Sequence, residues 1–553
     1  MMQKNYFFLL FLLVFLTHCA DTGKKEESEI SQSKPFLWEN ATVYFLLTDR
    51  FHNADSSNDV NFGRTGETGK LRGFKGGDIK GVTAKLREGY FEDLGVNAIW
   101  FSPVVEQIHG KVDEGTGDTY GYHGYWTSDW TALDPNFGTE EDLAEMVEEA
   151  HNRGIRVLLD VVINHTGPVT EKDLQWPEEW VRTSPPCTYQ DYSSTVSCTL
   201  VENLPDIKTD RDQPVELPGF IKEKWENEGR LEKEMQELDA FFAETGYPRA
   251  PRFYIIKWLV DLIRKYGVDG FRVDTVKHTE ESVWAELYRE AVKAFEDWKK
   301  RNPDKVLDEN EFFMMGEVYN YNISNTTQFD FGDSVVNYFD YGFNSLINFE
   351  FKYDATRPYE EIFSKYSDIL NGSMKGKTVL NYISSHDDGN PFDKEREQAF
   401  SAGTKLLLCP GGSQIYYGDE LARTLSVEGA MGDANLRSFM NWEDIGTNEN
   451  TTYLLAHWQK LGRFRNDHPA IGAGIHEMIS ESPYFFKRTY TGSGYEDKVI
   501  IGLDLEAGAQ QVDVTGVFEN GQSVKDYYSG NEWIVEGSIL TIEEHDGIVL
   551  LAN

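Results

Sequence analysis

Short apolar runs alternate with longer amphipathic stretches through most of this chain. The first run, residues 41–48, is apolar without interruption and rich in β-branched and aromatic side chains. It predicts a strand that is buried on both faces, as in a parallel sheet. Seven later runs predict further strands: residues 96–102, 155–163, 268–274, 312–317, 337–351, 378–384 and 413–417. The alternation of these strands with helices predicts an α/β fold.

Helical spacing marks several of the stretches between these runs. Thr139 is a predicted N-cap, apolar residues recur at helical spacing between 143 and 150, and Gly154 ends the helix. Three more predicted helices cover residues 83–94, 254–266 and 280–300. From 166 to 252 we read no regular alternation, and a stretch of that size is normally a functional insertion. After about residue 470, short alternating runs separated by glycine turns predict an antiparallel sandwich.

An arginine and a carboxylate lie together at the end of the run that begins at residue 268. Arg272 and Asp274 are two residues apart, so on a strand they face the same side. Taken alone, this pattern is most simply a buried ion pair. Glu317 and Asp387 also follow predicted strands, however, and the carboxyl ends of parallel barrel strands carry the chemistry. Three acidic strand ends therefore indicate a catalytic site.

Asp160 interrupts the otherwise apolar strand at 155–163. A carboxylate in such a run needs a partner, and Arg272 on the next predicted strand is the natural one. We therefore expect Asp160 to support the site structurally and to take no direct part in the chemistry.

Composition narrows the classes of partner. The 553 residues leave room for one large domain and one or two smaller ones. With 53 basic and 93 acidic residues, the net charge is −40, which argues against nucleic acid and anionic membrane surfaces as partners. A neutral polymer is unaffected by such a field.

The amino-terminal end has the features of an export signal. Lys4 precedes the apolar run 6–16, which is too short to span a bilayer. Cys19 then resembles the lipidated cysteine of bacterial lipoproteins, although His18 departs from the small residue usual before it. The resemblance implies an exported, membrane-anchored lipoprotein, in the outer membrane or at the cell surface. An ordinary cleaved signal, with a secreted or periplasmic product, is the alternative.

The other cysteines have separate explanations. Cys409 lies in an apolar run, where a buried free thiol is the default. Cys187 and Cys198 lie 11 residues apart in a polar stretch of an exported protein, which favours a disulfide over a metal pair.

Four motifs together resemble the α-amylase family of glycoside hydrolases: DVVINH at 160–165, GFRVD-x-x-KH at 270–278, GEV at 316–318 and HD at 386–387. The resemblance runs from about Val43 to the carboxyl end. It implies a (β/α)8 TIM barrel with a B domain inserted after strand three and a C-terminal antiparallel β-sandwich. The expected parts are a signal peptide at 1–19, a linker at 20–37, the barrel at 38–165 and 253–470, the B domain at 166–252 and the sandwich at 471–553.

The same resemblance implies roles for individual residues. Asp274 is the expected nucleophile, Glu317 the general acid/base and Asp387 the third catalytic carboxylate. The expected substrate-binding residues are His123, Tyr125, His165, Arg272, Lys277, His278 and His386. Packing is the plainer alternative for His123, and a solvated helix start for the Lys277–His278 pair. Ser385 departs from the asparagine that the family usually has before His-Asp, which puts a supporting hydrogen bond in doubt.

Calcium is the expected cofactor, because hard oxygen ligands on loops suit this ion. Asn164, Asp206 and the carbonyl of His278 match the ligands that join the B domain to the barrel in the family. A second loop resembles a calcium loop of cyclodextrin-forming relatives, with ligands Asn53, Asp55, Asn58, Asp59, Gly76 and Asp78. Clusters of Asn and Asp also form ordinary turns, which is the alternative for this second site.

The sequence thus predicts a monomeric, endo-acting, retaining α-amylase whose partner is an α-glucan polysaccharide. Leu204-Pro-Asp-Ile207 favours an α-amylase, whereas the loop after the first strand favours a glucanotransferase. Cyclomaltodextrinase, neopullulanase and glucanotransferase are the alternatives within the family. A non-catalytic glucan-binding lipoprotein is the alternative from another class.

Overall fold

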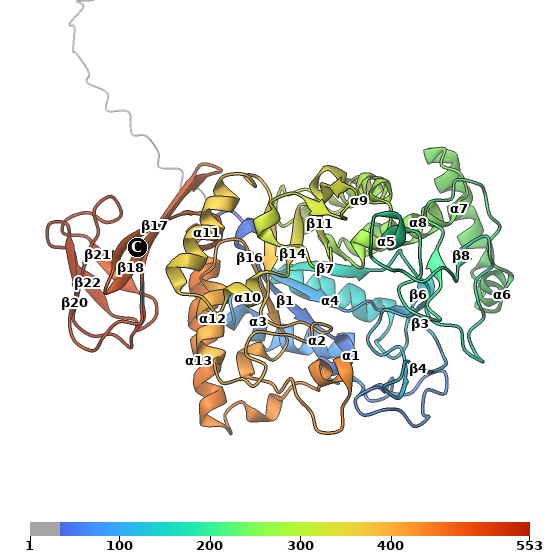
Figure 1. Ribbon diagram of the computed structural model, residues 1–553, viewed down its shortest axis with the longest axis horizontal. Coiled ribbons are helices and arrows are strands. Elements are labelled where there is room, and N and C mark those ends of the chain that lie inside the picture. Colours follow the sequence, from blue (N-terminus) through green and yellow to red (C-terminus); the bar gives the residue numbers. More distant parts are fainter. Residues whose placement is uncertain (1–33) are drawn as a thin grey trace, which may run out of the picture. The chain divides into compact units, whose positions relative to one another are not determined.

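A computed structural model describes residues 34–553, and their centre is a closed barrel of parallel strands (Figure 1). Each strand pairs with the next in the chain, and the last pairs with the first. The barrel strands are β1 Thr42–Leu46, β2 Ala98–Phe101, β7 Arg156–Val161, β10 Gly270–Val273, β11 Phe313–Gly316, β14 Ser345–Asn348, β15 Thr378–Asn381 and β16 Gly412–Tyr416. Every residue in them is buried, as their apolar composition requires. The predicted TIM barrel is confirmed.

Helices follow most barrel strands and cover the barrel (Figure 1). They are α2 Ile79–Arg87, α3 Tyr90–Asp93, α4 Glu140–Asn152, α8 Pro251–Tyr266, α9 Glu281–Arg301, α11 Tyr359–Asn371, α12 Ala399–Leu407 and α13 Glu449–Asp467. Thr139 caps α4 in a reciprocal capping box with Asp142. The helix predicted at 83–94 is in fact two, because Gly89 between α2 and α3 has a left-handed φ of 79° that breaks the helix.

The strand predicted at 337–351 is shortened to β14. Its first part forms the 3-10 turn Tyr338–Tyr341, and Gly342 follows with a φ of 102°. A Cβ at Gly342 would come within 2.5 Å of Tyr288, so the chain turns sharply beside α9. The aromatic residues that suggested a strand instead bury their rings in this turn, which is tertiary packing overriding propensity.

The insertion after the third barrel strand contains β8 Val181–Arg182, α5 Ser193–Val196, β9 Asp206–Ile207, α6 Gly219–Asn227 and α7 Leu231–Thr245. Cys187 and Cys198 are joined by a disulfide, and Cys409 is a buried free thiol. Two tryptophans of the insertion, Trp180 and Trp225, pack against Trp258 of α8, each with its ring centroid 6.4 Å from that of Trp258. The sequence did not predict α6 and α7.

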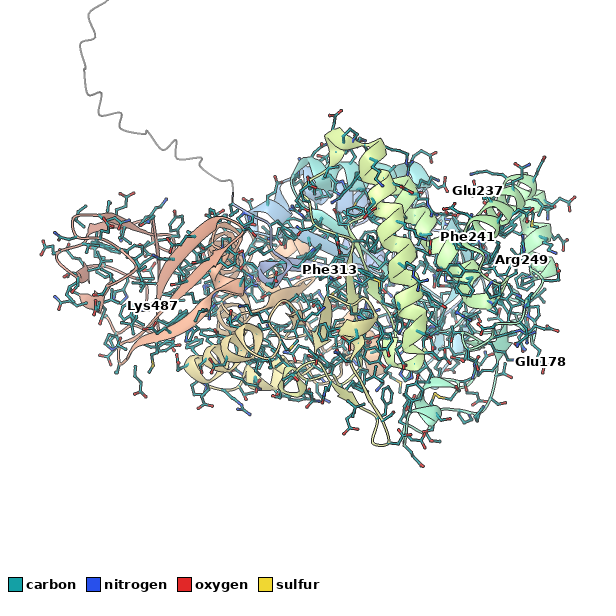
Figure 2. All side chains as sticks on the ribbon, turned by 90° about the horizontal axis from the view of Figure 1, so that it is seen from above. Glu178, Glu237, Phe241, Arg249, Phe313 and Lys487 are labelled. Atoms are coloured by element: carbon teal, nitrogen blue, oxygen red, sulfur yellow. A yellow bond between two sulfur atoms is a disulfide. The ribbon has the colours of Figure 1, made fainter. Side chains whose placement is uncertain are left out.

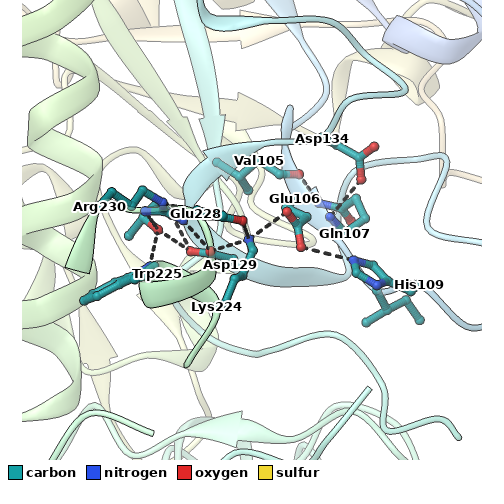
Figure 3. A network of polar contacts seen from close by, with 12 residues as sticks. Val105, Glu106, Gln107, His109, Asp129, Asp134, Lys224, Trp225, Glu228 and Arg230 are labelled. Atoms are coloured by element: carbon teal, nitrogen blue, oxygen red, sulfur yellow. Dashed lines mark hydrogen bonds and ion pairs between the residues drawn. The ribbon is translucent and has the colours of Figure 1, made fainter. Parts of the chain in front are cut away.

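Helices α6 and α7 are held to the hairpin of β3 Val105–Gln107 and β6 Thr127–Leu133 by a buried polar network (Figure 3). The Lys224 ammonium lies 2.7 Å from Glu106 and 2.6 Å from Asp129. Arg230 reaches the same Asp129 carboxylate at 3.2 Å. The two carboxylates are buried and the two cations are partly exposed, so the network gives the buried charges the partners they need where the helices meet the hairpin.

Smaller elements complete the barrel loops: α1 Thr48–Phe51, β4 Val112–Asp113, β5 Asp118–Thr119, β12 Phe329–Asp330, β13 Val335–Val336, α10 Phe351–Asp354 and α14 Ala470–Ala473.

The C-terminal part forms two antiparallel sheets that enclose their own apolar core, as predicted. One sheet contains β17 Ile475–Glu481, β18 Tyr484–Gly492, β19 Tyr495–Leu503, β24 Val549–Ala552, β21 Ser523–Asp526 and β22 Glu532–Ile534. The other pairs β20 Gln510–Asp513 with β23 Ile539–Ile542. From residue 34 onward, no helix is long and apolar enough to cross a membrane. The predicted signal peptide, Cys19 and most of the linker lie outside the described residues.

Candidate active site

Strand register brings the predicted catalytic residues to one end of the barrel. Arg272 on β10 is in register with Asp160 on β7. Asp274 and Glu317 directly follow the neighbouring strands β10 and β11, and Asp387 lies in the loop after β15. All four carboxylates therefore stand at or near the carboxyl ends of barrel strands, where the active sites of such barrels form.

The Arg272 guanidinium is the centre of this group. Its Nη1 lies 2.9 Å from Asp160 and 2.7 Å from Asp274, and its Nη2 lies 3.0 Å from Glu317. The residue is only 1% exposed, so its charge depends on these partners. Asp160 also accepts hydrogen bonds from the Trp100 indole at 2.9 Å and the Tyr125 hydroxyl at 2.7 Å. Its oxygens are occupied in this way, which fits the predicted supporting role.

Burial gives the two central carboxyl groups different proton affinities. It raises the pKa of Glu317 to about 8, with Arg272 opposing this shift and the charges of Asp274 and Asp387 adding to it. Burial also raises the pKa of Asp274, to about 6, and Arg272 again opposes the shift. Near neutral pH, Glu317 therefore holds its proton while Asp274 is ionised. This difference is what an acid and a nucleophile need.

Thr275, directly after Asp274, has a left-handed backbone with a φ of 48°. Such a conformation is rare for a β-branched residue and costs about 1–3 kcal/mol. It accompanies a useful contact, because the Thr275 N–H donates to Glu317 Oε2 at 3.0 Å. The strained turn thus ties the ends of β10 and β11 together.

Asp387 is the most accessible of the three predicted catalytic carboxylates, with 35% of its side chain exposed. The Ser385 hydroxyl donates to its Oδ1 at 3.2 Å, and His386 Nε2 lies 3.6 Å from its other oxygen. Ser385 therefore supplies a supporting hydrogen bond at the position where the sequence departs from the family. The next residue, Asp388, is buried and holds the loop through the Tyr382 hydroxyl at 2.6 Å and the Lys352 ammonium.

Predicted sugar-binding residues line the same region. The rings of Tyr125 and His386 are nearly parallel, 5.1 Å apart. His123 Nδ1 accepts from the Tyr125 N–H at 3.1 Å, and His165 Nε2 lies 3.2 Å from the Tyr125 carbonyl. Burial lowers the pKa of His165 to about 4 and lowers those of His123 and His386 well below the usual value. All three rings are therefore neutral at pH 7 and suit hydrogen bonding to neutral hydroxyl groups.

Two tyrosines that sequence reasoning missed stand near Lys277, on the Glu317 side of the site. The Lys277 ammonium lies 5.9 Å from the Tyr189 ring and 5.3 Å from the Tyr319 ring. Both tyrosines are accessible, at 52% and 43% exposed, and can stack on a sugar. Tyr319 follows Glu317 by two residues, which was an available signal. Tyr189 lies in the irregular insertion, where no pattern identifies it.

The residues predicted for the first calcium site come together at the base of the insertion. The backbone carbonyl of Asn164 accepts a hydrogen bond from the Ile207 N–H at 2.8 Å, and His165 forms an antiparallel bridge with Asp206. Asn164 and Asp206 therefore lie on neighbouring, hydrogen-bonded backbone segments. Thr279 Oγ1 donates to Asn164 Oδ1 at 3.3 Å and brings the His278 segment against them. Burial raises the pKa of Asp206 to about 9, although Arg182 lies 3.0 Å away and opposes the shift. Apart from Arg182, the predicted ligands beside this buried carboxylate are neutral oxygen donors, and such a set fits a hard cation such as Ca²⁺.

The second predicted calcium loop fits less completely. Asn53 donates to Asp59 at 2.8 Å, and a Cβ at Gly76 would strike both side chains. Asn58 Oδ1 is buried and has no hydrogen-bond partner within residues 34–553. These oxygens form a cradle that a cation can fill. Two other predicted ligands are engaged elsewhere: Asp55 pairs with Lys80, and Asp78 caps α2 and accepts N–H groups of residues 54 and 55. In the described chain no group of three or more His, Cys, Asp and Glu side chains could hold a metal, so any calcium would rely on amide and carbonyl oxygens as well.

Known proteins resemble this chain over most of its length. The family described as alpha amylase, catalytic domain, matches residues 45–468. A periplasmic alpha-amylase of Escherichia coli (strain K12) is 37% identical over 538 residues, which cover 86% of this chain and 74% of that protein. A cyclomaltodextrin glucanotransferase of Geobacillus stearothermophilus is 26% identical, over 92% of this chain and 65% of its own.

Solved structures show the same fold. An alpha-amylase from Anoxybacillus superposes with a TM-score of 0.63 at 22% identity, covering 94% of this chain and 99% of the other. The cyclomaltodextrin glucanotransferase CldA gives the same TM-score at 20% identity, over 93% and 99% of the two chains. The family match and the 37% identical relative both span most of the residues described above, and this protein is a member of the α-amylase family of glycoside hydrolases.

Proposed function

We propose that this glycoside hydrolase is an endo-acting, retaining α-amylase that cleaves α-1,4-glucosidic bonds of starch, glycogen and maltooligosaccharides. The observation that carries the proposal is the shared contact of Asp274 and Glu317 with one guanidinium. Retaining glycosidases use two carboxyl groups roughly 5–5.5 Å apart, whereas inverting enzymes need a wider gap for a water molecule. Asp274 and Glu317 contact the two Nη atoms of one Arg272 guanidinium, and this closeness suits the narrower arrangement of a retaining enzyme.

In the proposed mechanism, protonated Glu317 gives its proton to the leaving glycosidic oxygen while ionised Asp274 attacks the anomeric carbon. The C–O bond to the leaving sugar breaks, and a covalent glycosyl–Asp274 intermediate forms. Glu317, now ionised, takes a proton from water, and the hydroxide attacks the same carbon and releases Asp274. Asp387 and neutral His386 bind sugar hydroxyls, and these hydrogen bonds become stronger as the sugar ring distorts toward the transition state. Tyr125 supplies an apolar surface for the ring.

Calcium has a structural part in this proposal. Asn164, Asp206 and the His278 carbonyl would hold one ion, which would bind the insertion to the barrel beside the active site. The second loop, around Asn53, Asp59 and Gly76, would hold another.

A glucanotransferase is the second candidate, and the accessible pair Tyr189 and Tyr319 favours it. Sugar acceptors must compete with water for the glycosyl intermediate, and two aromatic rings beyond Glu317 would hold such an acceptor in place. The relatives named as cyclomaltodextrin glucanotransferases also keep this possibility open. The relative named as a periplasmic alpha-amylase, which is the more similar in sequence, supports hydrolysis and export.

The products formed from starch, pullulan and cyclodextrin distinguish an α-amylase from a glucanotransferase and a cyclomaltodextrinase. An α-amylase should release a range of short maltooligosaccharides from starch and leave pullulan and cyclodextrin largely intact. Cyclic or lengthened products would favour the glucanotransferase, and rapid opening of cyclodextrin would favour a cyclomaltodextrinase. Proton NMR of a fresh hydrolysate should show the α-anomer first. Initial release of the β-anomer would contradict the retaining mechanism, and no cleavage at all would favour the non-catalytic alternative.

A further inference from the structure

We propose that a groove between α7 and α8 binds a second segment of the glucan, outside the active site. The groove has a volume of about 500 Å³, within the range of sites for small ligands. Its walls come mainly from α7, α8 and β6, with single residues from β3, α4 and α9, and none of the proposed catalytic carboxylates lines it. The last turns of α8 line it through Asp261, Leu262, Arg264, Lys265 and Tyr266, and they precede the amino end of β10, whereas Asp274 follows the carboxyl end of that strand.

The floor of the groove is apolar and largely aromatic. Its residues are Trp130, Leu133, Phe241, Trp258, Leu262 and Tyr266. Phe241 and Glu237 project from α7 on this side of the molecule (Figure 2). The indole Nε1 of Trp258 is buried and has no hydrogen-bond acceptor within residues 34–553. A buried donor without a partner costs free energy, and a small shift of this side chain toward the groove would let a ligand hydroxyl relieve that cost.

The rim carries many charges, and most of them are paired with one another. The Lys257 ammonium lies 2.6 Å from Asp261 and 3.1 Å from Glu237. Arg264 also pairs with Asp261 at 3.2 Å, and Lys265 pairs with Glu140. A charged ligand would have to break one of these pairs to gain a partner of its own. A neutral ligand has no such cost and can use the remaining carboxylate oxygens as hydrogen-bond acceptors.

Among the described residues, the rim carboxylate Glu244 has no basic side chain in ion-pair contact and is exposed. A ligand that combines apolar faces with many hydroxyl groups matches both the floor and this rim. Hexose rings of an α-glucan have that chemistry, and they are the units of the proposed substrate. The inference thus rests on the proposed function and extends it: the groove would attach the enzyme to a polymer while another segment occupies the active site. Linked sites raise the local substrate concentration by avidity.

Adsorption to insoluble starch tests the groove, in a Glu317→Gln background so that the solid is not digested. Ala240 is exposed on α7 and lines the groove. Ala240→Trp should weaken adsorption about tenfold by filling the groove. Gln236→Trp is the matched control, since Gln236 is exposed on the same helix but does not line the groove; it should adsorb like the parent. Glu244→Ala should also weaken adsorption, and Glu232→Ala, elsewhere on α7, should not.

The same substitutions in the active enzyme should leave kcat/KM on maltotriose within about twofold of wild type, because this substrate is too short to engage both sites. Equal adsorption of Ala240→Trp, Glu244→Ala and their controls would overturn the inference. If Ala240→Trp lowered the melting temperature and the soluble activity together, its fold would be disturbed, and the adsorption of Glu244→Ala alone would then test the groove. Failure of every variant and the wild type to cleave any α-glucan would instead overturn the proposed function.

Discussion

Arg272 illustrates how single residues set the chemistry of this site. One buried cation faces three carboxylates, so it cannot hold all of them fully ionised when burial favours their neutral forms. Glu317 receives the largest rise in pKa, and Asp274 keeps the shorter contact with the guanidinium. At a pH between the two pKa values, Glu317 at the end of β11 is thus protonated while Asp274 at the end of β10 is ionised.

The pH dependence of kcat/KM should follow from these two groups. As pH falls through about 6, Asp274 takes up a proton and loses its nucleophilic oxygen. As pH rises through about 8, Glu317 loses the proton that the leaving oxygen needs. We therefore expect a bell-shaped profile with its maximum between these values. A profile that still rises above pH 9 would show that Glu317 is not the acid.

Substitution should separate the roles of the two carboxyl groups. Glu317→Gln should lower kcat on starch by about 10²–10⁴-fold, because it removes a general acid. Substrates with an activated leaving group should recover much of this activity, and the alkaline limb of their pH profile should disappear. Asp274→Asn should show no such recovery, because the attacking oxygen itself is changed. Equal recovery by both variants would contradict the assignment.

The sequence predicted most of the residues around Arg272 because they follow buried strands, whose position and spacing are readable. Asp160, Asp274, Glu317 and Asp387 could all be found in this way. Tyr189 could not, because its place near Lys277 depends on how an irregular 87-residue stretch, 166–252, folds back over the barrel. The roles of these residues stay predictions until variants are measured.

At the scale of elements, the strands were predicted more accurately than the insertion. Barrel strands are continuous apolar runs, whereas α6 and α7 are rich in charged residues and dock through buried ion pairs such as Lys224 with Glu106 and Asp129. Charges that will be paired inside look the same in a sequence as charges that face water. The strand prediction before β14 was wrong for another reason: the aromatic residues there favour strands but pack in a 3-10 turn.

The loop between β15 and α12 shows how an element can position a predicted catalytic residue. Asp388, next to Asp387, is anchored by buried Lys352 from α10. Lys352→Met leaves Asp388 without its counter-charge, and breaking a buried pair in this way costs about 3–5 kcal/mol. We expect a lower melting temperature and a lower kcat. The double variant Lys352→Met/Asp388→Asn should recover stability, because it leaves no uncompensated charge. A single variant as stable as wild type would show that the pair does not anchor the loop.

At the scale of the whole molecule, the amino-terminal segment decides where the enzyme acts. We propose that it is exported and anchored through Cys19, since the apolar run before this residue is short and a polar stretch follows. One acyl chain holds a protein only marginally, so stable anchoring needs more than one chain on the cysteine. Labelling with a fatty acid should tag the wild type but not Cys19→Ser. Equal labelling of both would exclude the anchor, and release of the unlabelled wild type into the periplasm or medium would support an ordinary signal peptide.

Calcium binding should link the barrel and the insertion into one cooperative unit. The donors Asn164, Asp206 and the His278 carbonyl come from three separate segments, so the unfolded chain cannot present them together. An ion that binds only the native state adds RT ln(1 + [L]/Kd), roughly 3 kcal/mol at a hundredfold excess over Kd. Chelation should therefore lower the melting temperature by several degrees, and added calcium should restore it. Asp206→Ala should remove most of this response, whereas Asn58→Ala, in the second loop, should leave it in place. A melting temperature that changes with neither chelator nor calcium would exclude the junction site. A response that is lost only in Asn58→Ala would assign the ion to the loop after β1.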